Sequence, residues 1–309
     1  MQTPSQYRYN AFVEYFKEKY GCRLQKVVVN AGFGCPNIGG CTYCDNDAFH
    51  PGYSTPDKPI LRQIDEGIEF HKVRYRRAQR YIAYFQPHSN TFAPIDRLKR
   101  LYGEALRHPE IEGIVIGTRP DCIDEEKLDY LQELQRSKIV IIEYGIESCY
   151  DRTLERINRG HDFECARKAV EMTAERGITQ CAHFIFGLPG ETLDEMMATS
   201  EMINTLPLTA VKFHQLQIIK GTRMEQEFAC KRSEFHEFDM DGYLSFIGEF
   251  LRRLRPDLYI DRFAGEVPPR FISPLQKSWG LVRYSELIRM LEERMEKLDI
   301  RQGDFYKNN

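Results

Sequence analysis

Residues 27–44 read Val27-Val28-Val29-Asn30-Ala31-Gly32-Phe33-Gly34-Cys35-Pro36-Asn37-Ile38-Gly39-Gly40-Cys41-Thr42-Tyr43-Cys44. A β-branched run, which favours a strand, leads into a glycine-rich loop that carries three cysteines spaced C-x5-C-x2-C. Thiolates are soft ligands, and three of them on one flexible loop can close around one face of a metal centre. The stretch therefore predicts a metal site directly after the first strand.

The number of cysteines leaves two kinds of metal site open. A structural zinc ion takes four protein ligands, so a residue such as His50 would have to complete a Cys3His site. A [4Fe–4S] cluster held by three cysteines instead keeps one iron open for a small molecule, which is a reactive arrangement. The zinc hypothesis describes a non-catalytic scaffold, and the cluster hypothesis describes an enzyme.

Composition limits the class of protein. The chain has 309 residues, enough for one large α/β domain or for a main domain with a smaller appendage, and a net charge of −3. Neither an apolar signal segment at the start nor a run of spanning length is apparent, so we expect a cytoplasmic protein without a membrane anchor. Nine cysteines, three of them clustered, are typical of reduced thiols and metal ligands, not of a disulfide framework.

Strand and helix patterns alternate along the chain. The strands are mostly continuously apolar, which predicts a parallel sheet covered by helices, either doubly wound or a barrel. The expected strands are 26–30, 80–86, 113–117, 138–144, 179–186 and 210–219. The expected helices are 10–20, 61–77, 94–106, one capped by Asp124, 163–176, 191–204, 241–254 and 284–298. In such barrels the reactive groups lie at the carboxyl ends of the strands.

The cysteine loop, with the aromatic Tyr43 just before its last cysteine, resembles the cluster loop of the radical S-adenosylmethionine (radical SAM) enzymes. Its first gap is five residues, where the commonest family pattern has three. Further phrases resemble the YhcC-like group, which is related to the radical SAM half of the Elongator catalytic subunit. They are Cys-Pro-Asn (35–37), Gly-Gly-Cys-Thr-Tyr-Cys (39–44), Ala-Tyr-Phe-Gln (83–86), Gly-Thr-Arg-Pro-Asp-Cys-Ile (117–123), Ile-Asn-Arg-Gly-His-Asp (157–162), Gly-Leu-Pro-Gly-Glu (187–191) and Lys-Gly-Thr (220–222).

This resemblance covers roughly the whole chain. It implies an α/β fold, a partial (β/α)6 TIM-like barrel of parallel strands in residues 1–223, with a small, mostly helical extension in residues 224–309. It also implies a [4Fe–4S] cluster on Cys35, Cys41 and Cys44 and S-adenosylmethionine (SAM) bound to the open iron. A one-electron reductant such as a flavodoxin or ferredoxin would then drive cleavage of SAM to a 5′-deoxyadenosyl radical that takes a hydrogen atom from substrate.

Residues that would contact SAM follow from the strand ends. The Gly-Gly-Glu-like segment common after the second strand of the family is missing, which leaves Gln86 and Asn90 as candidates, or a plain turn. On the fourth strand, a period of two places Glu143 and Glu147 on one face. The resemblance implies SAM contacts for Tyr43, Glu147 and Ser148, with Glu143 deeper as a catalytic candidate.

Three further strand ends carry candidates. Arg159 resembles the arginine that clamps the SAM carboxylate in several family members. Phe186, Gly187 and Pro189 resemble the segment that packs on the adenine. Lys220, at the mouth of an unusually polar sixth strand, is a candidate catalytic cation, although a solvated edge strand would explain it equally well. Arg119 either holds an anionic group or forms an ion pair with Asp121 or Asp124.

Only the resemblance to a known family gives an expectation for the substrate. The relation to Elongator suggests RNA, such as a tRNA nucleoside, and several arginines could contact phosphates. They are Arg74, Arg76, Arg77, Arg80, Arg252, Arg253 and Arg255. A small metabolite and a protein side chain remain alternative substrates.

Overall fold

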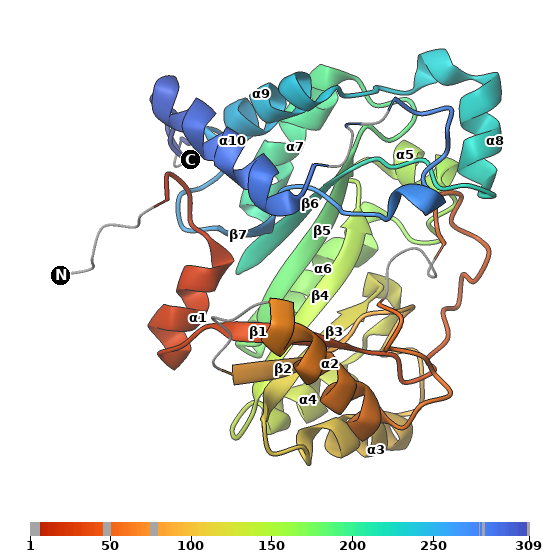
Figure 1. Ribbon diagram of the computed structural model, residues 1–309, viewed down its shortest axis with the longest axis vertical. Coiled ribbons are helices and arrows are strands. Elements are labelled where there is room, and N and C mark those ends of the chain that lie inside the picture. The colour runs from red at the N-terminus through yellow and green to blue at the C-terminus, as the bar shows by residue number, and fades with distance from the viewer. Residues whose placement is uncertain (1–6, 46–50, 75–79, 278, 280–281, 308–309) are drawn as a thin grey trace.

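The computed structural model describes residues 7–45, 51–74, 80–277, 279 and 282–307. Within this part of the chain, one sheet holds seven parallel strands in sequence order. They are β1 (Leu24–Val29), β2 (Arg80–Phe85), β3 (Ile111–Thr118), β4 (Ile139–Glu147), β5 (Thr179–Phe186), β6 (Ala210–Gln215) and β7 (Tyr259–Arg262). The sheet curls into a half-barrel, with β4 to β6 in the middle of Figure 1. The predicted α/β partial barrel is confirmed.

Helices cover the outer face of the sheet, because crossovers between parallel strands share one hand and so lie on one side. Between β1 and β6 these helices are α2 (Ile60–Arg74), α3 (Ile95–Leu106), α4 (Glu125–Leu134), α5 (Asp151–Arg156), α6 (Phe163–Glu175) and α7 (Leu193–Thr205). After β6 the chain forms α8 (Arg223–Cys230), which lies away from the sheet at the right of Figure 1, and then α9 (Met240–Leu251) and α10 (Tyr284–Lys297). Asp124 caps α4 as predicted, since its carboxylate accepts a hydrogen bond from the Lys127 N–H.

The sixth and seventh strands differ from the sequence prediction. β6 ends at Gln215, short of the predicted residue 219, and it pairs with both β5 and β7. The sixth strand is therefore not an edge strand. The unpredicted β7 comes from the region assigned to the C-terminal extension, so the sheet itself crosses the division at residue 223, and that division stays a prediction.

Helix α1 (Phe12–Tyr20) fills the amino-terminal end of the half-barrel. Phe12 and Phe16 pack against inward-facing residues of five strands, which are Ile82, Tyr84, Val115, Ile141, Cys181 and Ala210. The Asn10 carbonyl accepts a hydrogen bond from the Ile260 N–H at 2.7 Å, which joins the start of α1 to β7. Because aromatic rings close this end, the open interior lies at the carboxyl ends of the strands.

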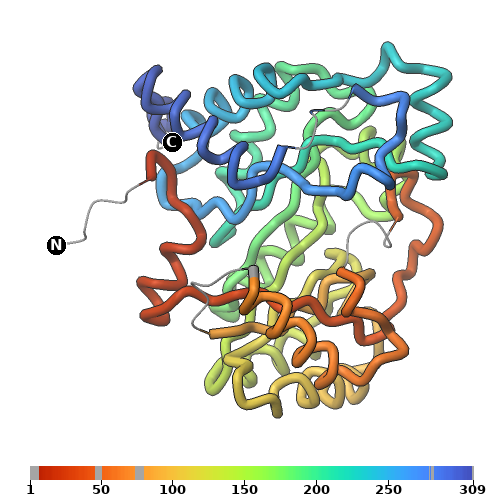
Figure 2. The backbone as a smooth tube through the Cα atoms, in the orientation of Figure 1, coloured from red at the N-terminus to blue at the C-terminus, as the bar shows by residue number. Residues whose placement is uncertain are grey.

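The two ends of the described chain lie side by side, near α10 (Figure 2). The Gln302 N–H donates to the Arg8 carbonyl at 3.0 Å, and Arg8 forms an ion pair with Asp299 at 2.7 Å. In the described residues, no helix is both long enough and apolar enough to cross a membrane.

Candidate active site

A cavity of about 340 Å³ opens at the carboxyl ends of the strands, and the three cysteines of the loop line it together. All nine cysteines of the chain are free thiols. The cavity has the size of a small-molecule site. Cys35, Cys41 and Cys44 are thus brought to one wall, as the spacing predicts. Tyr43, Gln86, Glu143, Glu147 and Arg159 of the sequence candidates line the same cavity.

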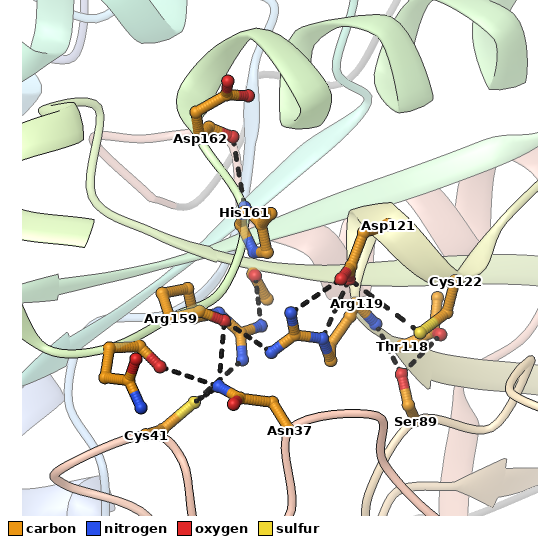
Figure 3. Close-up of polar contacts among 12 residues, drawn as sticks. Asn37, Cys41, Ser89, Thr118, Arg119, Asp121, Cys122, Arg159, His161 and Asp162 are labelled. Atoms are coloured by element: carbon orange, nitrogen blue, oxygen red, sulfur yellow. Dashed lines mark hydrogen bonds and ion pairs between the residues drawn. The ribbon is translucent and has the colours of Figure 1, made fainter. Parts of the chain in front are cut away.

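The cysteine loop is fastened to the segment that follows α5. The Asn37 amide donates to the Asn158 carbonyl at 2.7 Å, to the Arg159 carbonyl at 3.1 Å and to the Cys41 sulfur at 3.3 Å (Figure 3). Gly40 makes room for this amide, because a Cβ at Gly40 would lie 1.8 Å from Asn37 Oδ1. The sequence prediction did not include Asn37, although it lies in the quoted Cys-Pro-Asn phrase.

Arg159 lies buried beside the cysteine loop, 6% exposed. Its Nη2 donates to the Gly145 carbonyl at 2.6 Å and lies 3.6 Å from the Glu147 carboxylate, and its Nη1 lies 3.6 Å from the Cys41 sulfur. Its Nε is buried without a hydrogen-bond partner among the described residues. A buried guanidinium with an unused donor beside three thiols can receive an anionic group of a ligand.

Arg119 supports the backbone of Arg159. Its guanidinium pairs bidentately with Asp121 at 2.8 and 2.7 Å, and its Nη1 donates to the Arg159 carbonyl at 2.6 Å (Figure 3). Of the two interpretations of Arg119, the structure shows the ion pair with Asp121.

A layer of buried charges crosses the interior below the cysteines. The Glu143 carboxylate is fully buried and accepts hydrogen bonds from four side chains. They are Lys26 at 2.6 Å, Tyr84 at 2.7 Å, His183 at 2.8 Å and Lys212 at 3.0 Å. Burial alone would raise the pKa of Glu143, but the ammonium groups of Lys212 and Lys26 outweigh burial and hold this pKa well below its usual value.

Two histidines continue this layer toward the cavity. Burial and the Lys212 charge lower the pKa of His183, and burial with the neighbouring His183 lowers the pKa of His214 well below its usual value. Both rings are therefore neutral near pH 7. The sequence prediction missed His183, Lys212 and His214 as site residues, although it noted that the sixth strand, which carries Lys212 and His214, is unusually polar.

The remaining sequence candidates do not line the cavity. The Asn90 amide donates to three backbone carbonyls, the Ser148 hydroxyl donates to Glu191 at 2.5 Å, and the Lys220 ammonium donates to the Arg270 carbonyl at 2.9 Å. Phe186 packs among Phe213, Phe246 and Phe250, and Gly187 and Pro189 form the turn behind it. We infer that Asn90, Ser148, Phe186, Gly187 and Pro189 support the residues that line the cavity. Lys220 lies outside the cavity.

The donor set fits an iron–sulfur cluster. Within the described ranges, no group of three His, Cys, Asp or Glu side chains could hold a single metal ion. A [4Fe–4S] cluster instead binds each thiolate to a different iron, so its ligands stand farther apart than those of one ion. His50, the fourth ligand of the zinc hypothesis, lies outside the described residues.

Comparison with known proteins places the chain in a family. A model of the radical SAM superfamily matches residues 29–203, and a model of the radical SAM C-terminal domain matches residues 208–297. An uncharacterized protein, MJ0486 of Methanocaldococcus jannaschii, is 34% identical over 94% of this chain and 89% of that protein. Protein YhcC of Escherichia coli is 33% identical over 92% of each chain.

More distant relatives share part of their length with this chain. The tRNA uridine(34) acetyltransferase of Methanocaldococcus infernus is 24% identical over 61% of this chain and 34% of that protein. The solved structure of Methanocaldococcus infernus Elp3 has a TM-score of 0.68 and 18% identity, covering 91% of this chain and 64% of that one. The chain belongs to the radical SAM superfamily, whose enzymes use a [4Fe–4S] cluster and SAM.

Proposed function

We propose that Cys35, Cys41 and Cys44 hold the cluster and that this enzyme takes a hydrogen atom from a substrate bound in the half-barrel. The observation that carries the proposal is that these three thiols, Arg159 and Glu147 line one cavity at the carboxyl ends of the strands. When bound and reduced by one electron, the cluster supplies the cleavage of SAM into methionine and a 5′-deoxyadenosyl radical.

In this proposal the side chains of the chain bind SAM and keep water out of the cavity. Arg159, with its free Nε and its place beside Cys41, is our candidate for holding the SAM carboxylate. Glu147 lies 3.6 Å from Arg159 and is our candidate for the SAM amino group or ribose, and Tyr43 and Gln86 line the same cavity. Asn90, Ser148, Phe186, Gly187 and Pro189 hold the backbone around this cavity. The plug of Phe12 and Phe16 excludes water from the far end.

A tRNA nucleoside is the first substrate to test, because a relative carries the name tRNA uridine(34) acetyltransferase. The proposed phosphate contacts are weaker support. Arg252 and Arg253 lie within 4 Å of Glu249, and Arg255 pairs with Asp257 at 2.7 Å. The side chains of Arg74, Arg76 and Arg77 lie outside the described residues, and Arg80 is exposed, 3.7 Å from Glu112. A small metabolite or a protein remains an alternative substrate.

The test is anaerobic reconstitution with iron and sulfide, reduction with dithionite in the presence of SAM, and chromatography for 5′-deoxyadenosine. We expect the product from the natural protein and from Cys230→Ala, since Cys230 is exposed on α8, and none from Cys44→Ala. Product from Cys44→Ala at the natural rate would refute the ligand assignment. Addition of bulk tRNA should raise the yield if tRNA is the substrate, and a flavodoxin should replace dithionite.

A further inference from the structure

The cavity has one cation that no carboxylate of the described residues neutralises. Arg119 pairs with Asp121, Arg159 lies near Glu147, and Lys212 pairs with Glu143. Arg262, at the carboxyl end of β7, lines the same cavity, but its side chain makes no hydrogen bond or ion pair within the described part of the chain. Its guanidinium lies over the Tyr284 ring, 5.5 Å from the centroid, which holds it in place from one side.

Two neutral polar side chains line the cavity near Arg262 and are also unused. In the residues that the structure describes, neither the His214 ring nor the Gln217 amide makes a hydrogen bond, although both line the cavity. Both approach Gly265: a Cβ there would lie 2.8 Å from His214 Nδ1 and 3.2 Å from Gln217 Oε1. The absence of a side chain at Gly265 therefore lets the His214 ring and the Gln217 amide both lie close to the backbone there, side by side on the cavity lining.

We propose that Arg262, His214 and Gln217 form the recognition site for an oxyanion of the substrate, a phosphate or a carboxylate. A guanidinium matches either group through two parallel hydrogen bonds, and the neighbouring neutral groups can complete its hydrogen bonding. The three cysteines line the same cavity, so an anion held at this site would keep the rest of the substrate in the space that the cysteines also border. The inference rests on the proposed function only in treating the bound anion as part of a substrate. Binding of an anion by Arg262 does not depend on that function.

The space next to this site leaves room for a larger substrate. A second cavity of about 640 Å³ shares five lining residues with the first, which are Gln215, Leu216, Gln217, Gly265 and Glu266. Paired hydrogen bonds between the Gln215 side chain and the Gly265 backbone, at 2.9 and 3.2 Å, fix the shared wall. The body of the substrate can extend from the anion site into this second cavity.

Glu266, a carboxylate that lines the same cavity, makes the proposal testable in both directions. It is exposed, lines both cavities, and accepts the Tyr284 N–H at 2.7 Å. Its negative charge opposes an incoming anion, so Glu266→Gln should strengthen anion binding. A site for a cationic ligand would respond in the opposite direction.

The experiment is anaerobic calorimetric titration of the reconstituted protein, with and without SAM. The probes are inorganic phosphate and a nucleoside 5′-monophosphate in one arm, and acetate and succinate in the other. We expect saturable binding in one arm, weakened about 10–100-fold in Arg262→Gln, which is the range of a lost charge-assisted hydrogen bond. Arg262→Lys should lose less affinity, and Gly265→Ala should also weaken binding because its methyl group would push the His214 ring and the Gln217 amide out of place.

The matched control is Arg270→Gln. Arg270 also lies over an aromatic ring, 4.9 Å from the Phe271 centroid, but it is exposed and outside the cavity, so its replacement should leave anion affinity unchanged. Absence of saturable binding in both arms, or equal binding by Arg262→Gln, would overturn the inference. So would a loss of SAM affinity in Arg262→Gln in place of anion affinity. Failure of the natural protein to bind SAM would instead count against the proposed function, since the titration without SAM still decides the role of Arg262.

Discussion

Replacement of Glu143 tests the buried charge layer. Its carboxylate is fully buried and receives two ammonium groups, a histidine and a tyrosine hydroxyl. Removal of one partner from a buried ion pair costs about 3–5 kcal/mol. We expect Glu143→Ala to lose about 3 kcal/mol of unfolding free energy, the lower end of this range. The loss is limited because Asp261 remains 2.9 Å from Lys26 and 3.8 Å from Lys212 and still neutralises part of their charge.

The loss can be read as a change in melting temperature. Unfolding of 309 residues with about 2.1 cal/mol/K of entropy each converts a loss of about 3 kcal/mol into a drop of about 5 °C. Glu143→Gln keeps the side-chain volume and one acceptor oxygen, so its loss of unfolding free energy should be about half that of Glu143→Ala. The double variant Glu143→Gln with Lys212→Met should lose less than the sum of the two single variants, because it removes the unpaired ammonium group.

The pH dependence has a definite sign. The pKa of Glu143 is held below its usual value in the folded state, so its stabilising contribution is present above the ordinary glutamate pKa of about 4.5 and is lost as the pH falls further. Glu143→Gln should therefore lose less stability than the natural protein between pH 5 and the acid unfolding limit, by thermal melts in matched buffers. Melting of Glu143→Ala within about 1 °C of the natural protein would refute the reasoning.

Three further predictions concern the cavity wall and the turn behind it. Asn37→Ala should lower the reduction potential of the cluster, measured by potentiometric titration, because the Asn37 amide donates to the Cys41 sulfur at 3.3 Å; an unchanged potential would exclude this role. Arg159→Ala should weaken SAM binding about 10–100-fold in equilibrium titration, with partial rescue in Arg159→Lys, and unchanged affinity would end the carboxylate-clamp assignment. Gly187→Ala should cost about 1–3 kcal/mol of unfolding free energy, since Gly187 has φ +93° and its new methyl group would lie 2.9 Å from the His236 carbonyl. Gly21→Ala, at φ +71° with open space around it, should cost only about 1 kcal/mol, so equal losses would show that the His236 contact is unimportant.

The fold could be predicted because most of the six predicted strands carry continuous apolar runs, which only a covered parallel sheet buries. The seventh strand could not. Tyr259–Arg262 has four residues, two of them charged, and gains its strand conformation from pairing with β6, which no local pattern reveals. Local patterns also failed at Lys220, since β6 ends at Gln215 and the chain beyond it turns toward Arg270.

Site residues could be predicted where a single short segment carries a recognisable pattern of residue types. The cysteine spacing and the alternation of Glu143 and Glu147 both led to the cavity, although an irregularity between Gly145 and Glu147, with φ +76° at Glu147, interrupts that alternation. Arg262 and Gly265 could not be found this way. Their role depends on which carboxylates of distant strands reach Arg262 and which side chains approach Gly265, and both follow only from the assembled barrel.

The central claim is that the loop cysteines hold a [4Fe–4S] cluster, and the most direct measurement is the iron, sulfide and zinc content of the chain after anaerobic reconstitution. The account predicts about four irons and four sulfides per chain in the natural protein and in Cys230→Ala, with loss of both in Cys35→Ala. One zinc ion per chain with no iron, or a full cluster in Cys35→Ala, would contradict it.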